Sequence, residues 1–254
     1  MTSFDIKGLE AIDRARKPSG ADEEWRKATR YYEDQARPDT LARLRELGLG
    51  LKDNFRPLLV SLLRRMVDRI AVVYSRPPQR WLRRGLERLD ESSPEHQLML
   101  STLARSQYDL AWRLADRTRA NLRQCVLRFY PNDDLGRVVV RVFEPFNVLR
   151  DVSPSTADSM DSDRRFALRL QGSDRDAIFE YWEKVGPKQW RAGWCDANGQ
   201  DIQGHPFTVT GGLSTYSQLP VQIVYDDFSG GKPWLPPRQS RVAWSETIDC
   251  ATND

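Results

Sequence analysis

Apolar residues recur every three or four positions in the first half of this 254-residue chain, whereas in the second half they alternate with polar residues. The first spacing places apolar side chains on one face of a helix, and the second places them on one face of a strand. The period changes near Val126. Because helices and strands are segregated along the chain, the pattern predicts an α+β fold with a helical N-terminal half and a strand-rich C-terminal half.

The clearest helix is predicted over residues 54–74. Its apolar residues step by three or four and so share one face: Phe55, Leu59, Leu62, Met66, Ile70 and Val73. Residues 23–47 are predicted to form two short helices, because the residue before Pro38 resists the helical conformation. Gly48 then ends the second of them.

Three further segments separate these helices from the strands. Residues 92–124 are predicted to form one long helix that begins at Ser93-Pro94, a hydroxyl cap followed by proline in the first turn. Residues 76–90 hold apolar residues among arginines and are expected to form a further short helix. Residues 151–164 are nearly free of apolar side chains and are expected to form a loop.

The second half is predicted to begin with a hairpin, because two apolar runs flank a segment rich in turn residues. Later strands follow the same alternation, and Asn198-Gly199 marks a tight turn between two of them. The predicted strands cover residues 126–130, 138–143, 165–170, 178–185, 190–195 and 221–225.

The chain divides into four predicted parts. Residues 1–22 are polar and read as a flexible N-terminal arm. Residues 23–125 form the helical part, residues 126–237 form the β-rich part, and residues 238–254 are the first turns of another helix. Since a finished domain rarely ends one or two turns into a helix, we expect the sequence given to be incomplete.

Composition changes this picture little. Lys and Arg total 39 against 36 Asp and Glu, a net charge of +3, so the overall charge gives only weak support for a nucleic-acid partner. Eight tryptophans would suit subunit interfaces as well as a core. Cys125, Cys195 and Cys250 are too widely spaced for a disulfide framework or a zinc motif. The sparse cysteines fit a reducing cytoplasm. No signal peptide or membrane-spanning helix is expected.

Sequence patterns for catalysis are mostly missing. The two histidines, His96 and His205, are expected at the surface, and no Gly-x-Ser-x-Gly motif accompanies them. Gly230-Gly231-Lys232 lacks the remaining residues of a phosphate-binding loop. We therefore expect no enzyme, no cofactor and no metal site. Four acids that crowd one loop could bind Mg²⁺ or Ca²⁺, but they lack a recognised spacing and favour a solvated loop: Asp151, Asp158, Asp161 and Asp163.

One segment of the chain is unusually rich in arginine. Eight arginines lie in a short segment that also contains Asp68 and Glu87: Arg64, Arg65, Arg69, Arg76, Arg80, Arg83, Arg84 and Arg88. Arginine favours bidentate contacts with phosphate or carboxylate. The segment therefore fits a surface that meets DNA, a seam between subunits, or a solvated helix face. In the first two cases, reversing Arg83 and Arg84 to Glu should impair assembly or DNA packaging.

Five short segments follow one another in a characteristic order. They are Tyr31-Tyr32 before Arg37-Pro38, the helix from Asn54 to Asp68 with its Ser75–Pro78 turn, the strand Glu144–Val148, the Trp182 and Trp194 strands with their Asn198-Gly199 turn, and Leu219-Pro220-Val221 leading to Pro236-Pro237. In this order the chain resembles the portal proteins of tailed bacteriophages. The resemblance covers most of residues 30–254 and implies a fold like the portal wing, ending at the start of a stem helix.

The resemblance also implies a function without catalysis. Portal subunits form a ring, usually a dodecamer, at one capsid vertex, and double-stranded DNA is packaged and ejected through it. The implied partners are other copies of the chain, the major capsid and scaffolding proteins, terminase, and head-completion or tail adaptor proteins, with no membrane. The implied location is the virion and, during assembly, the host cytoplasm.

Two alternatives stay open beside the portal interpretation. One is another virion protein of similar α+β organisation, such as a head–tail adaptor. The other is a metal-dependent DNA-processing enzyme that would use Asp161 and Asp163 near the arginine-rich helices.

Overall fold

The fold is α+β, with the helices mainly in the N-terminal half and the strands in the C-terminal half, as predicted. The structure is a computed structural model that describes residues 3–17, 19–33, 35, 37–48, 62–71, 79–132, 136–151, 160–172, 176–187, 189–204, 214–215 and 219–225. The predicted stem helix at 238–254, the Pro77-Pro78 turn and the start of the 54–74 helix lie outside these residues.

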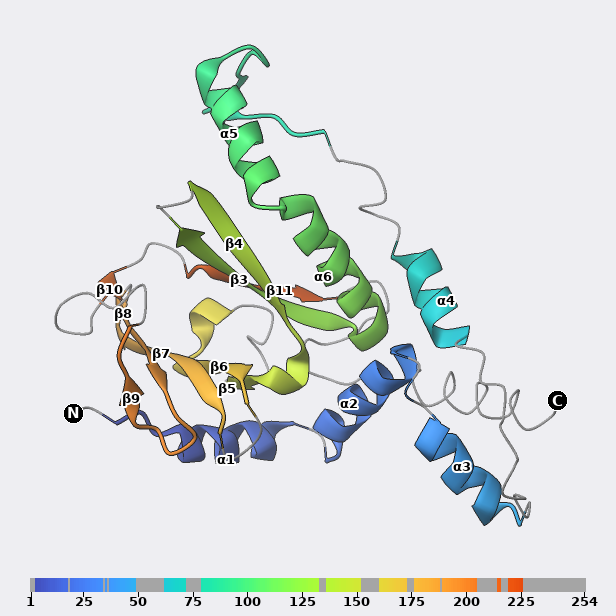
Figure 1. Cartoon of the computed structure of the whole chain (residues 1–254). Coiled ribbons are helices and arrows are strands. Elements are labelled where there is room, and N and C mark those ends of the chain that lie inside the picture. The colour runs from blue at the N-terminus through green and yellow to red at the C-terminus, as the bar shows by residue number, and fades with distance from the viewer. Residues whose placement is uncertain are drawn as a thin grey trace.

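Two antiparallel sheets form the centre of the molecule (Figure 1). The smaller has the order β11-β3-β4, and the larger has the order β10-β8-β7-β6-β5 with β9 paired to β8. The strands of the smaller sheet are β3 (Gln124–Asn132), β4 (Arg137–Phe143) and β11 (Val221–Tyr225). Those of the larger are β5 (Val148–Arg150), β6 (Arg165–Gln171), β7 (Ile178–Gly186), β8 (Gln189–Cys195), β9 (Asp201–Ile202) and β10 (Ser214–Thr215).

The main core lies between the two sheets. Val126, Phe143 and Ile223 of the smaller sheet pack in one cluster with Phe166 and Trp182 of the larger. These residues lie on the inner face of their strands, and helices cover the outer faces, so runs such as Cys125-Val126-Leu127 are buried on both sides. The hairpin of β3 and β4 and the strands at 165–170, 178–185, 190–195 and 221–225 confirm the predicted strands, although their burial does not strictly alternate.

A helix covers the outer face of each sheet, which gives four layers. Helix α6 (Tyr108–Leu122) packs on the smaller sheet, where Ala115 contacts Leu127. Helix α1 (Ile6–Arg16) packs on the larger sheet, where Ile6 and Leu9 join Tyr181 in a second core. The remaining helices are α2 (Ala21–Tyr32), α3 (Arg37–Glu46), α4 (Leu62–Ile70) and α5 (Pro94–Arg105), with 3₁₀ turns η1 (Pro145–Asn147) and η3 (Met160–Ser162).

A buried ion pair joins the two sheets. Arg128 of β3 donates to Glu180 of β7 at 2.9 and 2.7 Å, and neither side chain is exposed. Tyr130 donates to the other oxygen of Glu180 at 2.5 Å, and Trp182 donates at 3.1 Å. The Glu180 carboxylate therefore gathers four donor bonds between the sheets, which compensates for its removal from water.

A second buried network ties helix α1 to the larger sheet. Arg150 of β5 donates to both oxygens of Asp163, at 2.7 and 2.8 Å. Its backbone N–H donates to Asp13 of α1 at 3.1 Å, and Asp13 is paired with Lys17 at 2.6 Å. Each buried pair is therefore neutralised within its own segment, and the bond from the Arg150 N–H to Asp13 joins the two segments.

The predicted flexible arm is wrong for most of its length. Residues 1–22 include helix α1 and the beginning of α2, and Phe4, Ile6 and Leu9 are buried. The Phe4 ring stacks on Tyr181 with a centroid separation of 4.4 Å, and the Phe4 N–H donates to the Gly199 carbonyl at 2.9 Å. The apolar residues of this segment looked too few for a helix, but the outer face of the larger sheet buries them.

Two helix predictions between residues 79 and 124 need correction. The long helix over 92–124 is divided into α5 and α6, because Gln107 adopts a left-handed conformation with φ of 50°. The described part of the predicted helix at 76–90 is instead a short hairpin of β1 (Arg83–Arg84) and β2 (Glu87–Arg88). Gly85 turns this hairpin with φ of 64°, a conformation that glycine adopts without steric cost.

The helix pair α2 and α3 confirms the prediction for residues 23–47, and Gly48 follows α3 with φ of 72°. In α4, however, the buried side is rotated from the predicted one. Val67 is buried, while Met66 and Ile70, which were expected on the apolar face, are 53 % and 58 % exposed. Within the described residues, no helix is long and apolar enough to span a bilayer.

Candidate interaction surface on the helices

Helix α4 carries the first three arginines of the candidate segment, and all three are exposed: Arg64, Arg65 and Arg69. The helix packs against α2 and α6. Its Asp68 lies 4.0 Å from Arg64 and 3.4 Å from Arg117 of α6, and accepts a hydrogen bond from the Tyr32 hydroxyl at 3.0 Å. Burial, together with the nearby Asp68 carboxylate, raises the pKa of Tyr32.

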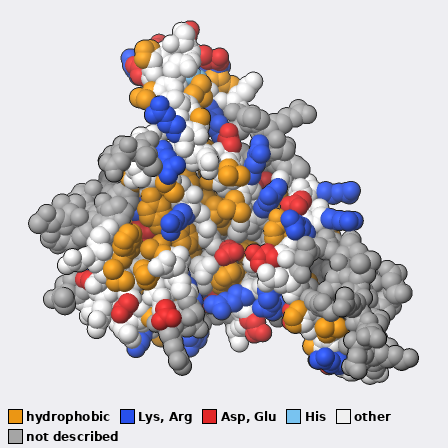
Figure 2. All heavy atoms as spheres, in the orientation of Figure 1, with side chains coloured by type: hydrophobic (Ala, Val, Ile, Leu, Met, Phe, Trp, Pro, Cys, Tyr) orange, Lys and Arg blue, Asp and Glu red, His pale blue; other side chains and the backbone are white. Residues whose placement is uncertain are grey.

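The outer side of α4 combines charge with apolar surface. Arg65 and Arg69 are four residues apart, as are the exposed Met66 and Ile70, so each pair forms a row along the helix. Among the described residues, no carboxylate pairs with Arg65 or Arg69. We call these four residues the α4 face. Figure 2 shows Lys and Arg side chains projecting from the region of α4.

The hairpin of β1 and β2 carries Arg83, Arg84 and Arg88 at the far end of α5 (Figure 1). Arg84 pairs with Glu95 at 2.8 Å, and Arg88 pairs with Glu91 at 2.6 Å and lies 4.5 Å from the centre of the Trp81 ring. Glu87, the acid within the hairpin, is not the partner in either pair. Acids that follow the segment in the sequence neutralise these arginines instead.

Arg80 is also neutralised, because it pairs with Asp109 at the start of α6 and its guanidinium lies 5.4 Å from the centre of the Tyr108 ring. Arg83 has no carboxylate partner among the described residues and faces Arg88 across the hairpin. Leu86, at the turn, is 96 % exposed. The hairpin end is therefore a mixed surface with little net charge.

The eight arginines do not form one patch. Arg64, Arg65 and Arg69 lie on α4, whereas Arg83, Arg84 and Arg88 lie on the hairpin at the far end of α5 (Figure 1). Arg80 lies beside the start of α6. Arg76 falls outside the described residues. A single track for a DNA duplex would require these groups to be continuous, so α4 is the part of the segment that best fits an interaction surface.

The acidic loop proposed for metal binding is partly engaged elsewhere. Asp163 is buried and paired with Arg150, and burial raises its pKa to about 6 against the opposing effect of Arg150. Asp151 pairs with Arg16 at 2.7 Å, while Asp161 is exposed and Asp158 lies outside the described residues. Across the described ranges, no group of three or more His, Cys, Asp or Glu side chains is arranged to hold a metal ion.

Other residues considered for chemistry are placed as follows. His96 is 2 % exposed, which corrects the prediction of a surface residue: its side chain is buried although Pro94, Glu95 and Gln97 around it are exposed. Burial raises the pKa of both Cys125 and Cys195 to about 12, so neither is a reactive thiolate at neutral pH. His205 and Cys250 lie outside the described residues.

The sequence did not single out a second group of arginines, which lies around β4. Arg105, Arg137, Arg141 and Arg169 line two adjoining hollows beside this strand. The available signal was the run Arg137-Val-Val-Val-Arg141, in which exposed arginines interrupt a strand pattern.

No protein-family model matches this chain, and no curated protein resembles it significantly.

Proposed function

We propose that this chain is part of the subunit of a phage portal, the ring at one capsid vertex through which double-stranded DNA is packaged and ejected. The order of its five characteristic segments supports this proposal, as does the segregated α+β organisation. On this proposal, terminase and the head–tail joining proteins dock on the assembled ring, and the subunit performs no chemistry itself.

The structural observation that carries the proposal is the α4 face. A ring needs one face of each subunit to meet a different face of the next, so each subunit must present surfaces that are not self-complementary. Arg65 and Arg69 beside the exposed Met66 and Ile70 supply such a surface, since arginine and methionine are enriched at protein interfaces.

The nuclease alternative has less support. It requires Asp161 and Asp163 to act together on a metal ion, but Asp163 is buried and bonded through both of its oxygens to Arg150. A head–tail adaptor remains compatible with the α4 face, because adaptors also assemble into rings.

Electron microscopy of the protein expressed from the complete reading frame tests the proposal. Class averages viewed down the particle axis should show rings with a central hole and cyclic symmetry. Side views distinguish a portal from an adaptor by the height of the ring. Monomers or dimers at every salt concentration tested would contradict both ring-forming functions.

A further inference from the structure

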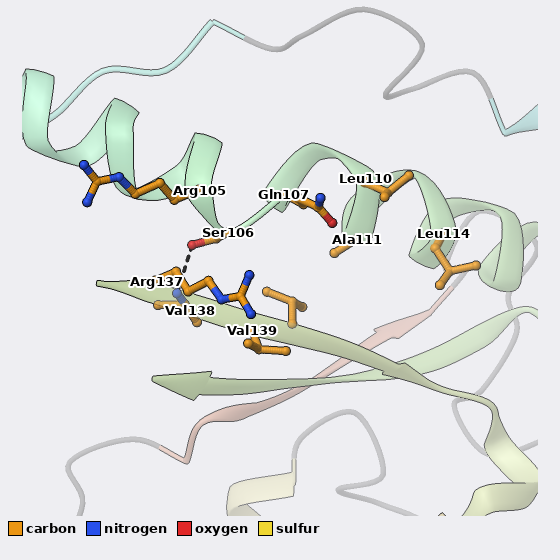
Figure 3. A pocket seen from close by; sticks show the side chains of 10 residues that line it. Arg105, Ser106, Gln107, Leu110, Ala111, Leu114, Arg137, Val138 and Val139 are labelled. Atoms are coloured by element: carbon orange, nitrogen blue, oxygen red, sulfur yellow. Dashed lines mark hydrogen bonds between the residues drawn. The ribbon is translucent and has the colours of Figure 1, made fainter. Parts of the chain in front are cut away.

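Strand β4 is the outer strand of the smaller sheet as far as the structure describes it. Among the described residues it pairs only with β3, at the end of the order β11-β3-β4. The backbone N–H of Val138 donates to the Ser106 hydroxyl at 2.9 Å rather than to β3, so the backbone groups of Val138 point away from β3, in the plane of the sheet (Figure 3). Successive residues of a strand point their backbone groups to opposite edges, so the N–H and C=O groups of Val140 and Val142 also point away from β3.

An independent hydrogen bond fixes the same alternation. The Phe129 N–H donates to the Pro220 carbonyl at 2.9 Å, on the β11 side of β3. Its neighbour Tyr130 must therefore bond toward β4, where its partner is Val139. Val139 and Arg141 thus complete the ladder with β3, and no described strand pairs with the backbone groups of Val140 and Val142 at the edge.

A groove follows this edge. Hollows of about 280 and 360 Å³ adjoin one another and share Leu114 of α6 and Val140 of β4. In Figure 3, Ala111 and Leu114 lie on the side of α6 that is turned toward β4. Leu110 and Leu114 are 61 % and 52 % exposed, so apolar surface lines the groove without being covered by the described residues. Figure 2 shows hydrophobic side chains gathered around β4 in the middle of this face.

The groove has basic side chains and no acidic ones. Arg105, Arg137, Arg141 and Arg169 line it, and neither hollow includes an Asp or Glu. The side chains of Val140 and Val142 pack toward α6, so Arg141, between them, projects from the opposite face of β4. A strand added at this edge would therefore meet leucines on one face and arginines on the other.

We propose that the edge of β4 binds an extended segment of another protein by adding it as a fourth strand of the smaller sheet. The bound segment alternates apolar residues, which face Leu110 and Leu114, with acidic residues, which face Arg141 and Arg169. Backbone hydrogen bonds to Val140 and Val142 supply affinity, and the alternation of side chains supplies specificity.

A second copy of this chain fits the groove less well. Two β4 strands side by side would bring Arg137 and Arg141 of each copy together, and like charges across a strand pair are destabilising. The other outer strand of the smaller sheet, Val221–Tyr225, contains no acidic residue to complement the arginines. The charge pattern therefore selects a different protein, and the inference does not depend on ring formation.

Exposed charge on an edge strand can also serve only to prevent aggregation. Arg137 and Arg141 project from a face of the sheet, whereas the hydrogen-bonding groups of the edge lie in its plane, so a strand that carries complementary charge can still pair with the edge. This difference makes backbone pairing the property to test.

The probe is a short fluorescent peptide in which glutamate and valine alternate, measured by anisotropy with the full chain. We expect saturable binding that weakens about tenfold when alternate peptide nitrogens are methylated, because methylation removes the donors that pair with β4. A peptide with lysine in place of glutamate should not bind. Equal binding of the methylated peptide, or of the lysine peptide, would overturn the proposal.

Protein variants locate the site. Val140→Pro removes an outward N–H but leaves the β3–β4 ladder complete, so it should keep the thermal transition and lose peptide binding. Arg141→Glu should weaken binding, whereas Arg14→Glu, the same charge change on exposed α1, should not. If the Val140→Pro variant binds the peptide as tightly as the unchanged protein, the edge of β4 is not the binding site. If the variant loses self-association while the peptide binds neither protein, the edge pairs with a second copy of this chain.

Discussion

At the scale of single residues, the most consequential group is the carboxylate of Glu180. It accepts from Arg128, Tyr130 and Trp182 in a fully buried position between the sheets. We predict that Glu180→Ala lowers the free energy of unfolding by about 3–5 kcal/mol, because it leaves the Arg128 guanidinium buried without a counter-charge. Urea unfolding followed by tryptophan fluorescence measures this change.

Glu183 on the same strand provides the control. It pairs with Arg191, and both side chains are partly exposed, so Glu183→Ala should cost less than about 1 kcal/mol. Replacing Arg128 and Glu180 together by apolar residues of similar size should recover much of the lost stability. A small effect of Glu180→Ala alone would show that water reaches Arg128 in the folded protein.

Glu144 gives a prediction about pH. Burial raises the pKa of Glu144, and the nearby Glu33 carboxylate adds a smaller effect in the same direction. The folded state then binds its proton more tightly than the unfolded state, so the contribution of Glu144 to stability falls as pH rises through the folded-state pKa. Glu144→Gln keeps an acceptor for the 3.0 Å hydrogen bond from Asn147 and avoids the buried charge.

Glu144→Gln should therefore raise the thermal midpoint near pH 7 and have little effect near about pH 4, where folded Glu144 is largely protonated. Circular dichroism melts at both pH values measure the difference. An equal gain at the two values would show that the substitution acts through something other than the ionisation of this residue.

The buried charged pairs could not be predicted from the sequence. Arg128 and Glu180 are 52 positions apart in the sequence, and Arg150 and Asp163 are 13 positions apart. In the alternating pattern Arg128 and Arg150 look like ordinary solvent-facing positions. Their burial depends on which face the opposite sheet covers, and that is set by tertiary packing rather than by local period.

At the scale of elements, helix α1 illustrates the same limit. Its apolar residues are few, so the segment looked disordered until the sheet that covers them was known. We predict that Leu9→Ala, at a fully buried position, lowers the free energy of unfolding by about 2–5 kcal/mol. Lys7→Ala, on the exposed side of the same helix, is the matched control, and chemical denaturation compares them. Equal effects would mean that α1 contributes little to the core.

The other misassigned elements failed for local reasons. The α5–α6 break needs a non-glycine residue, Gln107, in the left-handed region, which propensity argues against. The hydrogen bond between Ser106 and Val138 and the close approach of β4 hold that geometry. The hairpin at 83–88 is short and exposed, so its residues carry neither a helical nor a strand period.

The α4 face yields a prediction about assembly. If it is part of a seam between subunits, Arg65→Glu with Arg69→Glu should weaken ring formation while leaving the thermal midpoint unchanged, because both side chains are exposed. Sedimentation velocity measures the loss of the large species. Arg83→Glu with Arg84→Glu, which the sequence alone predicted would also impair assembly, is the comparison, and a smaller effect is now expected because Arg84 is already paired with Glu95. Intact rings in the α4 variant would remove this face from the seam.

At the scale of the whole molecule, the segregation into helices and strands was predictable because the hydrophobic period changes once, near Val126. The layering was not, because it brings together parts that the sequence separates. The N-terminal helix lies on the outer face of a sheet built from the second half of the chain, and α6 covers the other sheet. Which surface each helix covers depends on how the strands pair into sheets, and the pairing is not visible in the local sequence pattern.

The contact between Phe4 and Gly199 has a consequence for synthesis. The ribosome adds about 5–20 residues per second, so the residues that cover Phe4 and Leu9 emerge roughly 10–40 s after these two side chains. During that interval the apolar side of the first helix has no sheet to rest on. The nascent chain is therefore a natural client for chaperones that hold exposed hydrophobic segments, and its earliest residues are among the last to reach their final place.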